Sequence, residues 1–264
     1  MKKVKYLLKK YNLAPLNILS QNFLICGNVM EKMANYAKKT TLEIGPGLGF
    51  LTEKLSKKAD KVIAVEKDRG MIKVLKNEYN FKNVEIHHED FLKTNFSFDC
   101  CISSIPYSIS SKIIFKLLEK YHEYSVLLLQ KEYTEKMVKM NTRLGIMVNA
   151  LADIEIIDSV NRKCFYPPPK VDSLIVKLTP NRKVKTPLFS KTVRVLFQHK
   201  RKKVINALID SSRELNIDKK QARDIFSGVE YSEERVFKLD LEKIEKISES
   251  LGKILKNKNL ENAV

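Results

Sequence analysis

The strongest constraint on this chain is a short apolar segment that runs directly into three closely spaced glycines. Residues 41–44 (Thr-Leu-Glu-Ile) predict a buried strand, and residues 45–49 (Gly-Pro-Gly-Leu-Gly) predict a turn that opens a helix over 50–58. Glycines let the backbone adopt positive φ and approach a ligand closely, and a helix N-terminus presents free N–H groups. The next predicted strand, 61–66, ends in Glu66. This acid lies about 20 residues past the turn, the usual offset of a carboxylate that binds both ribose hydroxyls.

The glycine spacing narrows the kind of nucleoside that this turn would bind. A dinucleotide site has the pattern G-x-G-x-x-G, whereas Gly45, Gly47 and Gly49 form G-x-G-x-G, with Glu43 two residues earlier. This form resembles the nucleoside-binding turn of S-adenosylmethionine methyltransferases, whose ligand has a zwitterionic amino-acid end and no pyrophosphate. A glycine turn that only closes a strand–helix corner is the alternative. The acids that follow at the ends of later strands argue against it.

Composition limits the class of protein. A chain of 264 residues can bury one large core or two smaller ones, and 44% hydrophobic with 30% charged residues is typical of a globular protein. No run approaches the roughly 20 apolar residues of a membrane span, and residues 1–10 lack the apolar core of a signal peptide. We therefore expect a cytoplasmic protein. Its four cysteines and four histidines show no metal-ligand spacing, so we expect reduced thiols and no metal site.

The net charge of +18 is concentrated in two blocks. Residues 1–30 contain five lysines and no acid, and residues 173–209 contain ten Lys or Arg and no acid. A generally lysine-rich protein would spread its charge evenly. Two acid-free blocks in an otherwise nearly balanced chain indicate contact with a polyanion, and nucleic acid is the obvious candidate.

Strand and helix patterns alternate along most of the chain, which predicts an α/β fold with a mostly parallel seven-stranded sheet and helices on both faces. After Pro180 the strand signals stop. We therefore expect two domains, 1–180 with a basic arm and motif at 1–27, and a small all-α domain at 181–264. The expected strands are 41–45, 61–66, 83–87, 98–105, 124–130, 154–160 and 173–177. The expected helices are 28–38, 50–58, 68–78, 110–121, 131–140, 188–213, 218–227, 231–235 and 240–256.

The segment after the fourth strand carries residues suited to methylating an amine. Ser104, Ile105, Pro106 and Tyr107 place a small hydroxyl, a fixed backbone and an aromatic ring at the sheet end that holds the glycine turn. The lone pair of an exocyclic amine is delocalised into its ring, so acceptors must hold the amine hydrogens and draw the nitrogen towards tetrahedral geometry. The Ser104 hydroxyl and the Ile105 carbonyl could do this while Tyr107 stacks on the base. Such a reaction depends mainly on positioning and electrostatics. An ordinary strand-ending turn is the alternative.

Several motifs occur in an order that spans nearly the whole chain. They are Ser20-Gln21-Asn22-Phe23-Leu24, Glu43 to Gly49, Glu66, Asp90-Phe91, Ser104 to Tyr107, Phe165-Tyr166-Pro167-x-Pro169-x-Val171-x-Ser173, and Phe197-Gln198-His199-x-Arg201-x-Lys203. In this combination the chain resembles the ribosomal RNA adenine dimethyltransferases, nearest the archaeal and eukaryotic branch. The related family that methylates large-subunit rRNA shares the first motifs and fits the basic helix less well.

The resemblance implies a Rossmann-like class I S-adenosylmethionine-dependent methyltransferase. Its reaction would be dimethylation of two adjacent adenosines near the 3′ end of small-subunit rRNA, on a pre-30S-type particle, by a monomer. It also implies residue roles. Gln21, Asn22 and Leu24 would line the cofactor's amino-acid end, Gly45, Gly47 and Gly49 would pass beneath it, Glu66 would hold the ribose, and Asp90 and Phe91 would contact the adenine. Glu43 and Ser104 would be further cofactor-binding residues. Tyr107 and Phe165 would hold the flipped target base, and Lys200, Arg201, Lys202 and Lys203 would contact rRNA phosphates.

One residue departs from the family pattern. The family usually has Asn where this chain has Ser104. A serine hydroxyl can accept a hydrogen bond but reaches less far than an amide, which bears on the rate and on the second methylation. A ribosome-assembly factor with weak or no methyltransferase activity is therefore the alternative function.

Overall fold

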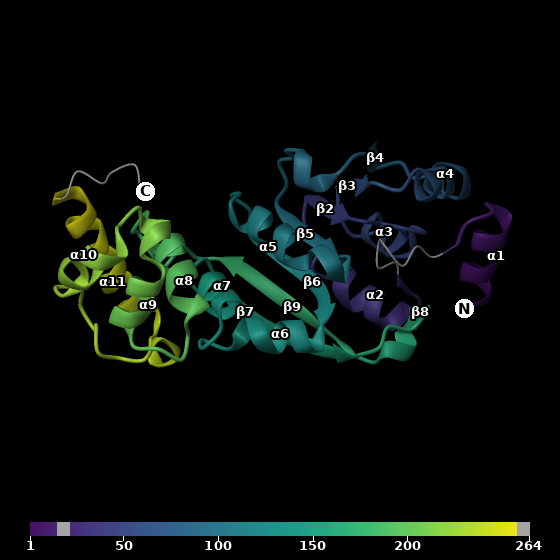
Figure 1. Ribbon diagram of the computed structural model, residues 1–264. Coiled ribbons are helices and arrows are strands. Elements are labelled where there is room, and N and C mark those ends of the chain that lie inside the picture. Colours follow the sequence, from purple (N-terminus) through teal and green to yellow (C-terminus); the bar gives the residue numbers. More distant parts are fainter. Residues whose placement is uncertain (15–21, 258–264) are drawn as a thin grey trace. The chain divides into compact units, whose positions relative to one another are not determined.

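The computed structural model describes residues 1–14 and 22–257 (Figure 1). Their contacts divide the chain into two compact units. The first comprises residues 1–134 and 153–180, and the second comprises residues 135–152 and the chain from 181 onward. The sequence predicted a single boundary at residue 180. The excursion of residues 135–152 into the second unit is therefore a difference from the prediction.

A seven-stranded sheet forms the centre of the first unit, in the order β4-β3-β2-β5-β6-β9-β7. Parallel pairing joins β4 to β3, β3 to β2, β2 to β5 and β5 to β6, while β9 is antiparallel to β6. This mostly parallel sheet confirms the predicted α/β class. Its strands are β2 (Thr40–Ile44), β3 (Lys61–Glu66), β4 (Val84–His88), β5 (Cys100–Ser103), β6 (Tyr124–Gln130), β7 (Ala152–Val160) and β9 (Ser173–Pro180).

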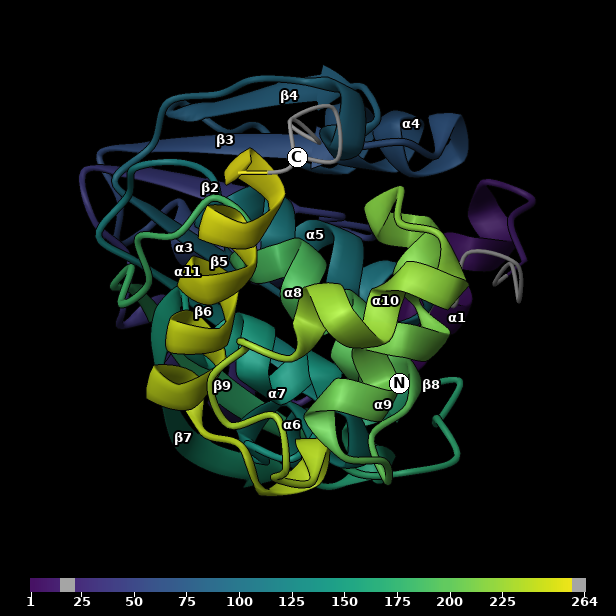
Figure 2. The ribbon, with the colours of Figure 1, turned by 60° about the vertical axis from the view of Figure 1, so that its left-hand side comes forward.

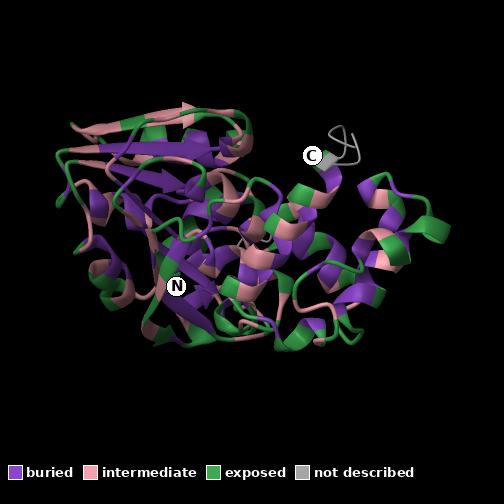
Figure 3. Ribbon diagram, turned by 90° about the vertical axis from the view of Figure 1, so that its left-hand side faces the viewer, coloured by how far each residue is buried: buried purple, intermediate pink, exposed green. Residues whose placement is uncertain are grey.

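Both faces of the central strands are buried, as Figure 3 shows. Alternate residues of a strand point to opposite faces. Val126 and Leu128 of β6 pack with Met33 and Leu55 from helices on one face, and the intervening Leu127 is equally buried on the other. Helices therefore cover both faces, as predicted. The helices of this unit are α1 (Lys2–Lys10), α2 (Gly27–Ala34), α3 (Phe50–Leu55), α4 (Arg69–Glu78) and α5 (Ser110–Leu118), and α6 (Lys131–Val138) runs across its boundary.

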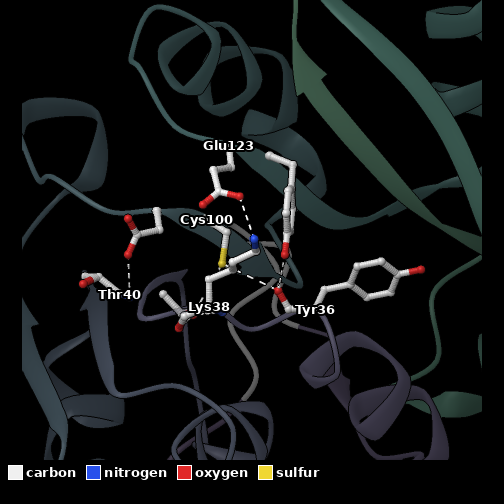
Figure 4. A network of polar contacts seen from close by, with 8 residues as sticks. Tyr36, Lys38, Thr40, Cys100 and Glu123 are labelled. Atoms are coloured by element: carbon white, nitrogen blue, oxygen red, sulfur yellow. Dashed lines mark hydrogen bonds and ion pairs between the residues drawn. The ribbon is translucent and has the colours of Figure 1, made fainter.

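A polar network fixes the amino ends of the strands (Figure 4). The Tyr36 carbonyl accepts a hydrogen bond from the Tyr124 hydroxyl at 2.7 Å and one from the Cys100 thiol at 3.7 Å. The Lys38 ammonium lies 2.8 Å from Glu123. These contacts join the loop before β2 to the starts of β5 and β6. Because the strands are parallel, their carboxyl ends then meet at the opposite edge of the sheet.

The second unit is helical, and most of its helices can be followed in Figure 2. Apolar residues that include Ile146, Val193, Leu208, Phe226 and Ile247 form its core. Its elements are α7 (Arg143–Asn149), α8 (Phe189–Gln198), α9 (Val204–Asp210), η5 (Ser212–Leu215), α10 (Lys219–Phe226), η6 (Val236–Lys238) and α11 (Leu241–Asn257). The helix predicted over 188–213 is therefore two helices with a break, the one predicted over 231–235 is wrong, and α7 was not predicted.

The cysteine prediction was wrong for two of the four residues. Cys26 and Cys164 form a disulfide, whereas Cys100 and Cys101 are free and buried. The bond joins the residue before α2 to the end of η4 (Arg162–Cys164), 138 residues later. Nothing in the spacing of the cysteines indicated that these two meet. In the described residues, no helix has the length and apolar character that crossing a membrane requires.

Candidate cofactor and substrate cavity

A cavity of about 400 Å³ lies at the carboxyl ends of β2, β3, β4 and β5. Ligands of open α/β sheets bind at this edge. Most of the site residues predicted from the sequence line it, namely Asn22, Leu24, Glu43, Gly45, Gly47, Glu66, Asp90, Phe91, Ser104, Ile105, Pro106 and Tyr107. Gly49 and Phe165 do not line the cavity, and Gln21 lies outside the described residues.

The glycine turn owes its shape to three positive φ angles, of 70°, 56° and 80° at Gly45, Gly47 and Gly49. A Cβ at Gly47 would lie 3.3 Å from the Phe23 ring, and one at Gly49 would lie 2.8 Å from the side chains of Leu75 and Tyr79. Gly45 and Gly47 therefore shape the cavity floor, whereas Gly49 lets α3 begin close against α4. The sequence predicted Gly49 as a cofactor residue, but it lies outside the cavity and its contacts are with α4.

Glu66 is the last residue of β3 and is held by two backbone groups. One carboxylate oxygen accepts the Gly47 N–H at 3.0 Å, and the other accepts the Asp68 N–H at 2.8 Å. Burial raises the pKa of Glu66, while these backbone donors oppose that shift. The carboxylate is thus fixed in orientation. Each of its oxygens keeps a second lone pair that can accept from a hydroxyl group in the cavity.

One oxygen of the buried Glu43 carboxyl has no hydrogen-bond partner in the part of the chain that the structure describes. Its residue is 2% exposed, it lines the cavity, and its Oε2 has no hydrogen-bond partner among the described residues. Burial raises the pKa of Glu43 to about 8. An unpaired polar atom costs free energy when it is buried. A ligand that brings a hydrogen-bond donor to this point would remove that cost, so the residue fits the polar end of a bound nucleoside.

Asp90 follows β4 and carries a negative charge at the next strand end. Its carboxylate accepts the Leu92 N–H at 3.0 Å and lies 3.0 Å from the Lys67 ammonium. Hydrogen bonding to Lys67 holds the pKa of Asp90 below its usual value. Sequence reasoning missed Lys67, although it directly follows Glu66 and could have been found as the first residue beyond a strand end. Phe91 is buried beside Asp90 and supplies an apolar wall.

The segment after β5 is held by hydrogen bonds to its neighbours. The Tyr107 hydroxyl lies 2.8 Å from the Ser173 hydroxyl, and the Ser110 hydroxyl donates to the Pro106 carbonyl at 3.2 Å. Burial raises the pKa of Tyr107, so its phenol is neutral. The structure records no hydrogen-bond partner for the Ser104 hydroxyl among the described residues. Ser104 is therefore available to accept a hydrogen bond from a group in the cavity.

Phe165 lies in a different environment from Tyr107. It is 2% exposed and packs with Leu24 and Met30 in the core of the first unit. Its strand β8 (Phe165–Tyr166) pairs with β1 (Phe23–Leu24), so that Leu24 lies opposite Phe165. The structure therefore does not bring Phe165 to the cavity where the sequence led us to expect it. Its ring instead supports the strand that carries Leu24.

The predicted RNA-contact residues lie in the second unit, in the break between α8 and α9. Lys200, Arg201, Lys202 and Lys203 are all exposed. Two of the four are neutralised by carboxylates. Lys202 lies 2.5 Å from Asp210, and Lys203 lies 2.6 Å from Glu233.

Comparison with known proteins assigns this architecture to a family. The family model described as ribosomal RNA adenine dimethylase matches residues 17–250. The chain belongs to this family. Members of the family use S-adenosylmethionine as methyl donor, and the cavity has the residues to hold it.

Relatives and solved structures agree with this membership. The chain is 43% identical over 263 residues to the "Probable ribosomal RNA small subunit methyltransferase A" of Thermococcus sibiricus, covering 94% of this chain and 96% of the relative. It is 43% identical over 257 residues to the same-named protein of Pyrococcus abyssi, covering 93% and 95%.

Among solved structures, a dimethyladenosine transferase from Plasmodium falciparum has a TM-score of 0.76 and 30% identity, covering 88% of this chain and 98% of the other. The 23S rRNA methyltransferase ErmE has a TM-score of 0.64 and 24% identity, covering 88% of this chain and 100% of the other. The likeness to ErmE shows the fold alone. The fold is that of class I S-adenosylmethionine-dependent methyltransferases, as the sequence predicted.

Proposed function

We propose that this protein dimethylates the exocyclic amines of two adjacent adenosines near the 3′ end of small-subunit (16S) rRNA. The observation that carries the proposal is one cavity that brings the nucleoside-binding acids Glu66 and Asp90 together with the segment from Ser104 to Tyr107. The acids suit the cofactor, and the segment suits an amine acceptor. The acid-free basic blocks and the small-subunit relatives support rRNA as the substrate.

The cofactor-side residues each contact a different part of the bound nucleoside. Glu66 accepts hydrogen bonds from the ribose hydroxyls, and Asp90 accepts from the adenine amine while the Phe91 ring packs beside the base. Asn22, Leu24 and Glu43 surround the amino-acid end, where the unpaired Glu43 oxygen can accept from the ammonium group. When bound, S-adenosylmethionine supplies an electrophilic methyl group. The proposed role of Gln21 falls outside the described residues.

The acceptor-side residues hold the target amine in place. The target base must leave its stack to reach a buried site, and Tyr107 can stack on it because the Ser173 contact fixes its ring. The Ser104 hydroxyl and the Ile105 carbonyl accept the two amine hydrogens, which turns the nitrogen lone pair out of the ring plane. No strong base is required, since the amine proton becomes acidic only as the N–C bond forms. Rate enhancement then comes from positioning.

The cellular setting follows from the same proposal. A pre-30S-type particle in the cytoplasm is the substrate that presents this rRNA segment, and the protein acts on it as a monomer. The first unit holds the cofactor, and residues 181–264 bind rRNA through the segment that contains Lys200, Arg201, Lys202 and Lys203.

The direct test combines the purified protein, labelled S-adenosylmethionine and small subunits that lack this modification. We expect label in the rRNA, recovered as dimethyladenosine after digestion and mass spectrometry. Tyr107→Ala should retain cofactor binding, measured by calorimetry, and lose most of the transfer. Bound cofactor without any label in the RNA would contradict the proposal.

Ser104 supports a second candidate, an assembly factor with weak or no methyltransferase activity. The serine hydroxyl reaches less far into the cavity than the asparagine amide usual in the family. If the protein is chiefly an assembly factor, Ser104→Asn should gain activity over a nearly inert parent. A parent that already gives dimethyladenosine at a useful rate would rule out this candidate, and Ser104→Asn would then change mainly the ratio of dimethyl to monomethyl product.

A further inference from the structure

The second unit contains a pocket of about 490 Å³ lined by five cationic side chains. They come from three separate segments of the chain. Arg201, Lys202 and Lys203 follow α8, Arg223 belongs to α10, and Arg235 precedes η6. All five residues are exposed, so the pocket is open to a ligand from solution. Sequence reasoning found the first three, which are adjacent, but not the two arginines from later segments.

Backbone contacts hold two of these segments together. Lys203 and Arg235 form an isolated antiparallel bridge, and the Val236 N–H donates to the Lys202 carbonyl at 3.0 Å. The Arg235 guanidinium donates to the Arg201 carbonyl at 2.6 Å. Two of the cationic side chains are therefore placed by a shared backbone pairing. A site arranged in advance loses less entropy when it binds.

The charges of the pocket are not all available. Lys202 is paired with Asp210 at 2.5 Å, and Lys203 is paired with Glu233 at 2.6 Å. Across residues 1–14 and 22–257, Arg201, Arg223 and Arg235 have no carboxylate within ion-pair distance. Three arginines thus line the pocket without an ion pair of their own. Guanidinium groups bind phosphate through paired N–H donors, which makes arginine the side chain best suited to this anion.

We propose that this pocket binds a phosphodiester group of the rRNA substrate, with Arg201, Arg223 and Arg235 as its ligands. The inference rests on the proposed function, because that function makes RNA the polyanion at this surface. It also changes which residues of the basic segment 200–203 we expect to bind RNA. Lys200 does not line the pocket, and Lys202 and Lys203 are held by carboxylates. The run at 200–203 therefore contributes chiefly Arg201.

The test compares two substitutions on one helix. Arg223→Gln and Lys220→Gln each remove one positive charge from an exposed position of α10, but only Arg223 lines the pocket. Binding of a fragment of small-subunit rRNA to the full-length protein is measured over a range of salt concentrations. Arg223→Gln should weaken binding about tenfold and reduce the salt slope by about 1. Lys220→Gln should change affinity less than about twofold. Equal losses in both variants, or no loss in Arg223→Gln, would overturn the proposal.

A third substitution predicts an effect of the opposite sign. Asp210 lines the pocket and neutralises Lys202 and Lys219. Asp210→Asn removes the acid and frees two lysines, so RNA binding should become severalfold tighter and more salt-dependent. Damage to the fold, which is monitored by thermal melting, would weaken binding instead. Weaker or unchanged binding by a variant that melts like the parent would overturn the proposal.

Failure of the pocket and failure of the proposed function give different results. Cofactor affinity is measured by calorimetry, and methyl transfer is measured on unmodified small subunits. Suppose that the parent protein binds the cofactor and methylates rRNA, but Arg223→Gln leaves RNA affinity unchanged. This result would overturn the proposed phosphate pocket and leave the proposed function standing. A parent that binds the cofactor and transfers no methyl group would overturn the proposed function.

Discussion

Tyr107 illustrates how a single contact can place a ring in the cavity. Its hydroxyl lies 2.8 Å from the Ser173 hydroxyl of β9, and this hydrogen bond fixes the position of the ring. Tyr107→Phe and Ser173→Ala each remove this hydrogen bond and keep the ring. We expect each to lower kcat by up to about tenfold, with cofactor affinity unchanged. The double variant should be no slower than the worse single variant. Additive losses in a double-mutant cycle would show that Ser173 does not act through Tyr107.

Glu43 predicts a pH dependence of stability in the protein without cofactor. Its pKa is raised from 4.5 to about 8 by burial, so the folded protein binds this proton more tightly than the unfolded chain does. The stability contributed by the protonated group is complete below about pH 4.5 and is lost as the pH rises through about 8. Melting temperature should therefore fall across this range, and Glu43→Gln should flatten the curve. Parallel curves for parent and variant would contradict the assignment.

At the scale of single residues, the sequence indicates which side chains line the cavity where the signal is local. Glu66 is the last residue of β3 and Asp90 lies just after β4, and a strand end fixes where a nearby side chain lies relative to the sheet edge. The pairs that the sequence missed join residues far apart, as with Lys67 and Asp90 or Tyr107 and Ser173. No local pattern encodes such pairs. Phe165 carried a motif signal, but whether a ring lies in a cavity or in the core depends on the packing around it.

At the scale of elements, the disulfide connects the segment after β1, whose Leu24 lines the cavity, to the segment before β8. Cys26 follows β1, which carries Leu24, and Cys164 precedes β8, which pairs with β1. A bond that closes a loop of this length restricts the unfolded chain and typically stabilises a protein by about 2–4 kcal/mol. Cys164→Ser should lower the melting temperature in oxidising buffer. In the presence of a thiol reductant, parent and variant should melt alike. A deficit of the same size in both buffers would show that packing of the thiol, rather than the bond, is responsible.

The elements that were predicted incorrectly are those governed by distant contacts. Apolar periodicity through 188–213 favours one long helix, but the chain breaks after α8 because residues 200–204 bond to the segment 234–237. That same pairing holds residues 231–235 out of a helix. By contrast, α7 had a local signal, since the Thr142 hydroxyl accepts the Gly145 N–H and caps its start. A capping threonine before an apolar stretch could have revealed it.

At the scale of the whole molecule, the second unit is built from two separate segments of the chain, residues 135–152 and the chain from 181 onward. A change from alternating strands and helices to helices alone predicts the boundary near residue 180, because it is a change of pattern. Residues 135–152 contain the end of the helix predicted over 131–140 and the helix α7, which was not predicted, and no change from strand to helix patterning marks where this segment leaves the first unit. Only packing assigns it, since Ile146 and Ala150 are buried in the core that Leu208 and Phe226 share.

This division predicts opposite effects of one substitution in two forms of the protein. In the full chain, Ile146 is 0% exposed in the core of the second unit. Ile146→Gln leaves a buried amide without partners, so it should lower the free energy of unfolding by about 2–4 kcal/mol in urea titrations. A fragment of residues 1–180 lacks most of that core, which leaves Ile146 in water. There the same substitution should improve solubility and leave cofactor binding by calorimetry unchanged. If Ile146→Gln destabilises both forms equally, residues 135–152 pack within the first unit, because only a partner retained in the fragment can produce the same loss.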